Sequence, residues 1–382
     1  MVIAVAKKSF LLTLRYLASR FSILLLLQLA TQIVFIAATY NRSTVNAGIH
    51  LLVKENKQIP IKLSAKTDFE HESTDLIANV FYRRLSNLYK LMLPNGANGS
   101  NVLWIRHQAR NWYIEDQRYG EDLIIGGLVK NDPQAIEAGF KMFDWGFAHQ
   151  VDDGSFFITG DRFHSTSFFV ESVARSLLVI QQSPYAKKYA DQVAKYKPLV
   201  HRAARWMIKP NIWKIGIGRN KPYTHRRYLV ATALGLTGKL TGDQELIEYA
   251  HKSIEDGLSL QRPDGVNPEK NGHDSSYQMV GVIYAQRWVT YFPQDEITSK
   301  VVVMINKSLL WEQTRILPSG EISTENNTRT AGQEKGRSGK LKSIDRKSAL
   351  HAFAYWASVT GNQQSEENAH KIASFYYKTR KS

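Results

Sequence analysis

One loop in the second half of the chain combines side chains that can move protons with a backbone that turns sharply. Residues 262–278 read Arg-Pro-Asp-Gly-Val-Asn-Pro-Glu-Lys-Asn-Gly-His-Asp-Ser-Ser-Tyr-Gln. The Asp-Gly and Asn-Gly dipeptides favour turns, and helical spacing of aromatic residues begins at Tyr277. His273, Asp274 and Tyr277 are therefore expected at a loop-to-helix junction, where a scaffold can aim polar groups into a cleft. The structural alternatives are a helix N-cap for Asp274, a core aromatic for Tyr277 and an ordinary loop residue for His273.

Three further polar clusters precede predicted helices at comparable places along the chain. Their members include Arg106 and Trp112 in the first, His164 in the second, and Asn220, Tyr223, His225, Arg226 and Arg227 in the third. Arginine pairs with carboxylate or sulfate, and aromatic faces stack on sugar rings. For any one of these residues a solvated or capping role is the alternative. A fold that brings the four clusters together would place them around one substrate-binding cavity.

A repeat of glycine-containing loops indicates how that could happen. The loops fall at 96–99, 153–154, 216–218, 264–265 and 319–320, in steps of roughly 50 to 60 residues, which suits an array of helical hairpins. Helix pairs are predicted at 167–181 with 186–207, 225–237 with a helix starting at Asp243, and 275–291 with 295–313, followed by 348–359. The best strand patterns, 155–159 and 212–217, are short.

The first helix of each predicted pair is rich in aromatic and small residues. This favours an all-α fold in which the pairs close into an (α/α) toroid rather than an open solenoid, with the glycine-marked loops on one face. The segment 321–347 is rich in Arg and Lys and is expected to be a loop near the rim of the cleft, or else a solvated loop without a role.

The N-terminal part of the chain has the pattern of a membrane anchor. Residues 21–40 contain no charged residue, and a helix of this length can cross a bilayer. The basic residues that precede this run predict a cytoplasmic N-terminus. A cleaved signal peptide is the alternative. The predicted organisation is a cytoplasmic and membrane-spanning segment at 1–42, a stalk at 43–74 and an extracytoplasmic toroid domain at 75–382.

Composition limits the partners. The chain of 382 residues has a formal net charge of +16 and no cysteine, so it lacks disulfides and thiolate metal sites, and an anionic partner or a solvated basic surface is expected. No phosphate-binding glycine loop, nucleophile elbow or His-Glu-x-x-His helix is present, and no nucleic-acid motif accompanies the basic residues. We expect no metal and no cofactor.

The third and fourth clusters resemble segments of toroidal polysaccharide lyases of the chondroitin, hyaluronate and alginate type. The similarity covers roughly residues 210–290. It includes the run from Asn220 to Arg226, the following helix that ends in the Leu-Thr-Gly-Asp turn before residue 244, and the Asp-Gly … His … Tyr pattern that ends at Tyr277. Where the family has Asp-Gly-Ser-Phe, this chain has Asp-Gly-Val-Asn. The resemblance implies carboxylate neutralisation by Asn220 and proton transfer by His273 and Tyr277. It also implies a grip on the acid group or leaving sugar by Arg226 or Arg227.

For the chemistry that the resemblance implies, His225 joins Asn220 and Arg226 as a donor for a uronate carboxylate, and Arg106, Trp112, His164, Tyr223 and Asp274 are expected to bind substrate. The favoured function is cleavage of a uronate-containing acidic polysaccharide by β-elimination. The alternatives are a glycoside hydrolase that uses two carboxylates, for which Asp116, Asp153, Asp264, Glu269 and Asp274 are available, and a non-catalytic binder or assembly factor for the same polymer.

Overall fold

The computed structural model describes residues 62–157, 159–331, 334–336 and 339–378. All regular elements in these ranges are helices, and β pairing is limited to isolated bridges, so the predicted all-α fold is confirmed for them. They belong to one compact unit that starts at Lys62, earlier than the predicted boundary at 75. Among the described residues, none of the helices has the length and apolarity needed to cross a bilayer. The predicted membrane span at 21–40 lies outside the described part of the chain.

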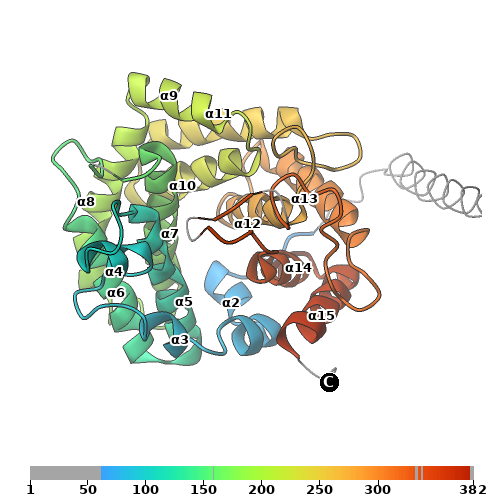
Figure 1. Ribbon diagram of the computed structural model, residues 1–382, viewed down its shortest axis with the longest axis horizontal. Helices are drawn as coiled ribbons and strands as arrows, with labels where there is room; N and C mark the ends of the chain where they lie inside the picture. The colour runs from blue at the N-terminus through green and yellow to red at the C-terminus, as the bar shows by residue number, and fades with distance from the viewer. Residues whose placement is uncertain (1–61, 158, 332–333, 337–338, 379–382) are drawn as a thin grey trace, which may run out of the picture. The chain divides into compact units, whose positions relative to one another are not determined.

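Five helix pairs make up most of the unit. They are α5 (Gly120–Lys130) with α6 (Pro133–Phe147), α7 (Arg162–Gln182) with α8 (Ala190–Met207), α10 (His225–Thr241) with α11 (Gln244–Leu260), α12 (Ser275–Tyr291) with α13 (Thr298–Gln313), and α14 (Arg346–Thr360) with α15 (Gln363–Tyr377). The first helices also contact one another in chain order, from α5 through α7, α10 and α12 to α14. In Figure 1, α12 and α14 lie near the middle of the molecule, whereas α8, α11 and α15 lie toward its periphery.

Burial explains why the two helices of a pair differ. Most of α10, from Arg227 to Gly238, is buried around its whole circumference, whereas α11 buries one stripe that includes Leu246, Ala250 and Ile254. A helix that is apolar on all sides belongs in a core, and one with a single apolar stripe covers a core. The predicted pairs are confirmed in type and order, with boundaries displaced by a few residues.

The remaining elements are short. They are α2 (Asp68–Glu72), the π-helical η1 (Ile77–Phe81), α3 (Ser86–Tyr89), α4 (Ser100–Ile105), the 3-10 helix η2 (Ile114–Tyr119) and α9 (Pro210–Asn220). The strand pattern at 212–217 was a wrong prediction, because Pro210 occupies the first turn of a helix and the apolar residues follow within it. In the described residues of 155–157 and Thr159, β pairing is limited to isolated bridges, through Phe156 and Thr159.

The glycine-marked turns repeat with one geometry. Their glycines, all with φ between +90° and +95°, are Gly96, Gly154, Gly265 and Gly320. A Cβ at any of them would overlap the carbonyl oxygen of a residue on the second helix of the following pair, namely Lys141, Arg202, Lys307 and Lys371. Only glycine fits both the backbone angle and the close approach. Gly218, the remaining member of the predicted series, lies inside α9 with no atom near its Cβ position, so this turn is missing before α10.

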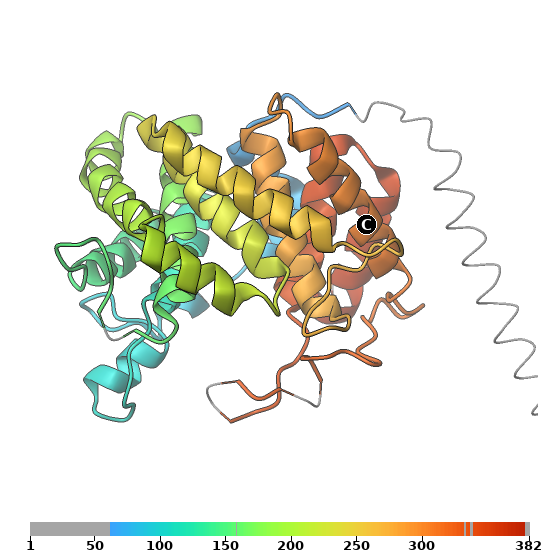
Figure 2. The same cartoon turned by 90° about the horizontal axis from the view of Figure 1, so that it is seen from above.

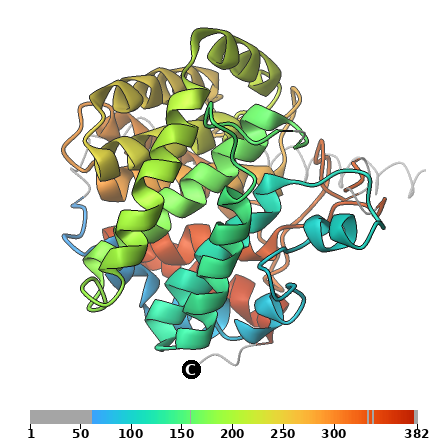
Figure 3. The same cartoon turned by 90° about the vertical axis from the view of Figure 1, so that its left-hand side faces the viewer.

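Two segments extend from the same side of the unit. Figures 2 and 3 agree that α4 and the described parts of segment 321–345 project from one side. Asp274, the N-cap of α12, holds that segment by accepting hydrogen bonds from the backbone N–H groups of Arg329 and Thr330, at 2.9 and 2.7 Å. The basic segment is therefore attached to the start of α12.

Candidate functional site

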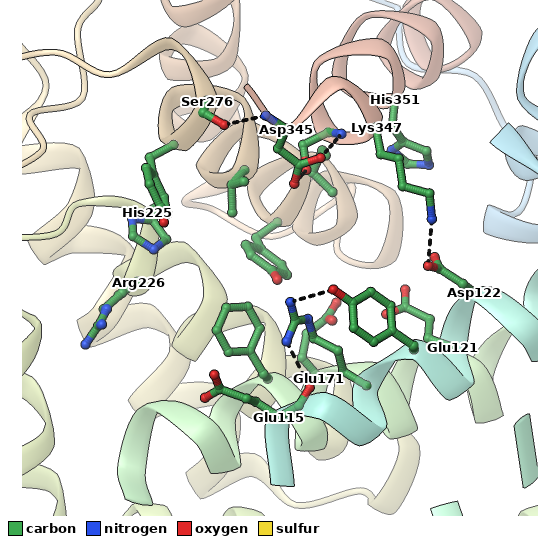
Figure 4. Close-up of a pocket in the computed structure, with 18 of the residues that line it drawn as sticks. Glu115, Glu121, Asp122, Glu171, His225, Arg226, Ser276, Asp345, Lys347 and His351 are labelled. Carbon is green, nitrogen blue, oxygen red and sulfur yellow. Dashed lines mark hydrogen bonds and ion pairs between the residues drawn. The ribbon is translucent and has the colours of Figure 1, made fainter. Parts of the chain in front are cut away.

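A cavity of about 700 Å³ lies among the first helices of the five pairs. Each of these helices contributes to it, for example Glu121 of α5, His164 of α7, His225 of α10, Tyr277 of α12 and Lys347 of α14. His164, His225 and Tyr277 lie within the first turns of α7, α10 and α12, so the N-terminal ends of these three helices lie at one end of the cavity. Figure 4 shows His225 and Arg226 on one side of the cavity and Asp122 and His351 on the other.

His225 and Glu269 form a buried pair at the helix N-terminal end of the cavity. Glu269 Oε1 accepts hydrogen bonds from the His225 backbone N–H at 3.1 Å and from its ring Nδ1 at 2.7 Å, while Arg329 donates to Oε2 at 3.1 Å. Burial raises the pKa of Glu269, but His225 and Arg329 outweigh it and bring the pKa below its ordinary value. Because an ionised carboxylate can only accept, Nδ1 carries the hydrogen, which leaves Nε2 with a lone pair.

The protonation state of His225 suits that tautomer. Burial lowers its pKa below the ordinary value, with Arg329 and Arg226 acting in the same direction and Glu269 opposing. The ionised Glu269 does not depend on a protonated imidazole, because the backbone N–H and Arg329 also donate to it. His225 Nε2 has no hydrogen bond to any residue that the structure describes. The neutral ring is therefore a base whose lone pair is available in the cavity.

Tyr277 lies beside this imidazole and among cations. Its ring centroid is 4.7 Å from that of His225, and the guanidinium carbon of Arg329 lies 3.5 Å from the centroid of the phenol ring. Lys342 Nζ donates to Tyr277 Oη at 2.9 Å. A negative charge that develops on this oxygen would be stabilised by the ammonium group in a site of low dielectric constant.

Glu334 holds the two cations in place. It accepts from Arg329 Nε and Nη2, both at 3.1 Å, from Lys270 Nζ at 2.7 Å, and from Lys342. Burial raises the pKa of Glu334, but these hydrogen bonds outweigh it and the pKa lies below the ordinary value. An ionised Glu334 thus fixes the positions of Arg329 and Lys342 around Tyr277.

Arg226, in the cavity lining, has unused hydrogen-bonding capacity. Its Nη1 makes only long contacts, 3.4 Å to Asp161 and 3.3 Å to Asn220, and its buried Nε has no partner among the described residues. Its guanidinium carbon lies 4.3 Å from the ring centroid of Tyr223, which Arg329 approaches from 4.6 Å. Arg226 is therefore placed to bind an anion brought by a ligand.

His164 completes this end of the cavity. Its ring centroid lies 6.4 Å from that of His225, and its Nδ1 has no partner among the described residues. Burial, followed by the charge of Arg226, holds the pKa of His164 well below the ordinary value, so the ring is neutral. A neutral imidazole can donate one hydrogen bond and accept another without adding charge.

Several predicted site residues lie outside the cavity lining and serve the fold. Arg227 is buried; it donates to Asp256 at 2.7 Å and to the backbone oxygens of Asn220, Lys221 and Tyr223, so it fixes the turn before α10. Asn220 is buried beneath this turn. Asp274 is fully buried as the cap of α12 described above.

His273, Arg106 and Trp112 also lie elsewhere. His273 Nε2 contacts the backbone oxygen of Glu325 at 3.1 Å, and its ring packs on Trp311. Arg106 is exposed at the end of α4, and Trp112 is buried against Trp145. Thus Tyr277, His225, Arg226, Tyr223 and His164 are brought together, while the position expected for His273 is taken by His225.

The other end of the cavity holds a buried network of charges that the sequence analysis missed. Arg287 donates to Glu171 at 2.5 Å and pairs with Glu121 at 2.8 Å, and Arg175 pairs with Glu121 at 2.6 Å. The contact with Arg287 would by itself keep Glu171 ionised. Burial and the neighbouring Glu121 charge outweigh it and raise the pKa of Glu171 to about 7. Glu171 is only 1% exposed, and burial is the largest of these effects.

A signal for this network is visible in the sequence. Glu171, Arg175 and Arg287 interrupt long apolar stretches of α7 and α12. A charge inside a fully buried helix needs a partner, so each such residue points to another. The partners are far apart in the sequence, and their pairing is specified only by the fold.

The cavity is not predominantly basic, although the chain is. Its lining has equal numbers of acidic and basic side chains, with Glu115, Glu121, Asp122, Asp161, Glu171, Glu334 and Asp345 facing Arg118, Arg175, Arg226, Arg287, Arg329, Lys342 and Lys347. Arg226, Arg329 and Lys342 gather near Tyr277, whereas Glu121 and Glu171 lie at the other end. Within the described residues no group of three or more His, Asp or Glu side chains is arranged to hold a metal ion.

Comparisons with protein-family models, with curated proteins and with solved structures give no match to this chain.

Proposed function

We propose that the protein cleaves an anionic, uronate-containing polysaccharide by β-elimination at the helix N-terminal end of the cavity. The observation that carries the proposal is the contact between the rings of His225 and Tyr277, with Arg226, Arg329 and Lys342 around them. Elimination from a uronate needs a base, an acid and a cation that neutralises the carboxylate. These side chains provide all three.

In this proposal His225 is the base. Its Nε2 lone pair takes the weakly acidic proton next to the uronate carboxyl, and Glu269 stabilises the imidazolium that forms through Nδ1. The role resembles the carboxylate–histidine pair of acyl-transfer enzymes, in which the carboxylate fixes the tautomer. The low pKa of His225 keeps the base in its reactive form at neutral pH.

Tyr277 is the acid in the same step. As the carbon–oxygen bond of the glycosidic link breaks and the carbon–carbon double bond forms, Tyr277 Oη gives its proton to the leaving oxygen. Lys342 compensates the phenolate that results, from 2.9 Å. A proton then returns to Tyr277 from solvent, and the His225 proton leaves to solvent, so the cycle closes without another reactant.

Arg226 binds the substrate carboxylate. Its Nε has no hydrogen-bond partner among the described residues and can donate to a planar carboxylate, while the adjacent Tyr223 ring can stack on the face of the sugar that carries it. Burial lowers the pKa of Arg226 below its ordinary value because it disfavours the charged guanidinium. A bound carboxylate would supply the negative charge that offsets this cost. Asn220 supports Arg226 from 3.3 Å rather than reaching the substrate itself.

The proposal extends to the architecture and to the location of the protein. The arrangement of the helices in five successive pairs favours an (α/α) toroid, and so does a cavity lined by the first helix of every pair. The uncharged run at 21–40 favours a membrane anchor with the body outside the cytoplasm, where acidic polysaccharides are found.

Incubation with a panel of acidic polysaccharides, namely alginate, polygalacturonate, hyaluronan and chondroitin, tests the proposal. The wild-type protein should produce the ultraviolet absorbance of an unsaturated uronate with at least one of them. Tyr277→Phe and His225→Gln should reduce turnover by roughly 10²- to 10⁴-fold and leave substrate binding nearly unchanged. His273→Ala should keep its activity, since His273 lies outside the cavity lining. Equal turnover in wild type and both site variants would refute this assignment.

A glycoside hydrolase is the second candidate, and Glu171 favours it. A carboxyl group whose pKa is raised to about 7 remains partly protonated near neutral pH and can act as a general acid. Hydrolysis would place the reaction at the deep end of the cavity and would yield saturated reducing ends. Loss of activity in Glu171→Gln together with full activity in Tyr277→Phe would favour it.

A further inference from the structure

The short helix α2 occupies the end of the cavity opposite His225 and Tyr277. It contacts α5, α7, α12 and α14, four of the five helices that line the cavity. Its partners lie toward the C-terminal ends of α7 and α12: Gln182 accepts from the Asp68 backbone N–H at 3.2 Å, and Tyr355, which donates to Asp68 at 2.8 Å, also contacts Thr290 at 3.1 Å. A segment in contact with so many of these helices at that end lies across the space between them.

Buried charges hold α2 there. Asp68 accepts both Nε and Nη2 of Arg175 at 2.8 Å, and Glu72 accepts from Arg175, from Tyr82 at 2.8 Å and contacts His351 Nε2 at 2.7 Å. The exposed fractions are 0% for Asp68 and Glu72 and 1% for Arg175. Although burial raises the pKa of Glu72, the charges of His351 and Arg175 lower it well below the ordinary value, so the carboxylate stays ionised.

Helix α2 and its ion pairs with Arg175 separate the cavity from solvent at the end opposite His225 and Tyr277. Arg175, Tyr82 and His351 face the cavity, and their hydrogen bonds run to α2 on the far side, where no solvent reaches the carboxylates. A bidentate, fully buried arginine pair leaves neither room nor free donors for a polymer to pass. The cavity therefore has a closed floor made of Arg175, Glu121, Glu171 and Arg287.

We propose that the cavity is a dead-end pocket that accepts a chain end, so that the protein shortens its polysaccharide from a terminus rather than cutting it internally. The mode of attack rests on the proposed function; the pocket itself does not. A volume of about 700 Å³ lies within the range of pockets that enclose a drug-sized ligand, which corresponds to a few sugar rings rather than a crossing polymer. The terminal rings would pass His225 and Tyr277 and come to rest on the apolar surface of Phe168 and Tyr284, beside Glu171.

Two further features suit a terminal sugar at the floor. Phe168 and Tyr284 both line the cavity and pack against each other in a tilted contact, with ring centroids 6.5 Å apart, so together they offer one apolar surface. Glu171 and Arg287 lie beside them and provide hydrogen-bond acceptors and donors for hydroxyl groups. An internal segment of a polymer would need a second exit, and α2 occupies that position.

The first measurement follows the products in time, using whichever polymer of the panel is cleaved. Terminal attack predicts one small product of fixed size from the earliest turnover, with the new double bond either on that product or on the shortened chain, and solution viscosity falling only in proportion to mass lost. A ladder of intermediate oligosaccharides with an early, steep fall in viscosity would overturn the proposal. Release of one small sugar with no gain of ultraviolet absorbance in either the small product or the remaining polymer would support the dead-end pocket and refute elimination, so the two ideas fail separately.

The second measurement does not depend on turnover. Tyr277→Phe protein is titrated calorimetrically with size-fractionated hyaluronan, alginate, polygalacturonate and chondroitin of two chain lengths. A dead-end pocket predicts a fixed number of protein molecules per chain, at most one for each end, whatever the length. A stoichiometry that grows in proportion to chain length, or binding to chains of none of the four polymers, would overturn the proposal.

Discussion

The raised pKa of Glu171 predicts a pH-dependent penalty on folding that a single substitution removes. Glu171→Gln keeps the size of the side chain and its contact with Arg287 but cannot ionise. The pKa of Glu171 rises from 4.5 to about 7 because of burial and the neighbouring Glu121. Below pH 4.5 the group is protonated in the folded and the unfolded chain, and the wild type pays no penalty. As the pH rises toward 7, the unfolded chain loses this proton first, so stability falls.

The magnitude follows from the same two values. A full shift of this size corresponds to about 3 kcal/mol, since one pKa unit is worth about 1.4 kcal/mol. Because part of the change lies below pH 5, the difference in unfolding free energy between Glu171→Gln and wild type should increase by about 2.5 kcal/mol between pH 5 and pH 8. Burial of neutral His164 and His225 acts in the opposite direction in this range, but it is common to both proteins and cancels in the difference.

Urea unfolding at a series of pH values, followed by tryptophan fluorescence, measures this difference. Glu255 on α11 is exposed, so Glu255→Gln provides a matched control that should show a flat difference. A flat difference for Glu171→Gln as well would refute the reasoning, because it would mean that Arg287 keeps Glu171 ionised despite its burial.

Three other substitutions test separate parts of the account. Gly265→Ala should lower the unfolding free energy by at least about 1–3 kcal/mol, because φ is +94° and Lys307 leaves no space, whereas Gly218→Ala in α9 should be neutral or stabilising. Asp274→Ala should lower the unfolding free energy by more than the roughly 1 kcal/mol of a lost N-cap, because it also removes the hydrogen bonds from Arg329 and Thr330; a lower Tm in calorimetry measures this. Lys342→Met should lower kcat by roughly 10²-fold with little change in Kd, whereas Lys340→Met, an exposed neighbour, should change neither.

The sequence predicts the helices better than it predicts the site. Apolar spacing and capping residues locate α10 and α12 closely, because both signals depend on residues near in the chain. The glycine turns were found for the same reason, and Gly218 misled because a glycine is also tolerated within a helix.

Roles within the site were harder to assign. His273 and Asp274 precede Tyr277 directly, but an N-cap must point its side chain at the helix, which turns Asp274 inward and His273 away. Glu269 and His225 meet across 44 residues, and Arg329 and Lys342 reach Tyr277 from a segment further along the chain. No local pattern encodes these contacts, because they depend on how α10, α12 and the segment after α13 pack.

The source of the oxygen in the new chain end tests the central claim most directly. Cleavage is run in oxygen-18-labelled water with the polymer that gives the highest turnover, and the products are analysed by mass spectrometry. Elimination with His225 as base and Tyr277 as acid predicts an unsaturated uronate, lighter than the hydrolysis product by one water, and no label at the bond that was cleaved. A saturated product that carries one labelled oxygen would contradict the account and move the reaction to Glu171.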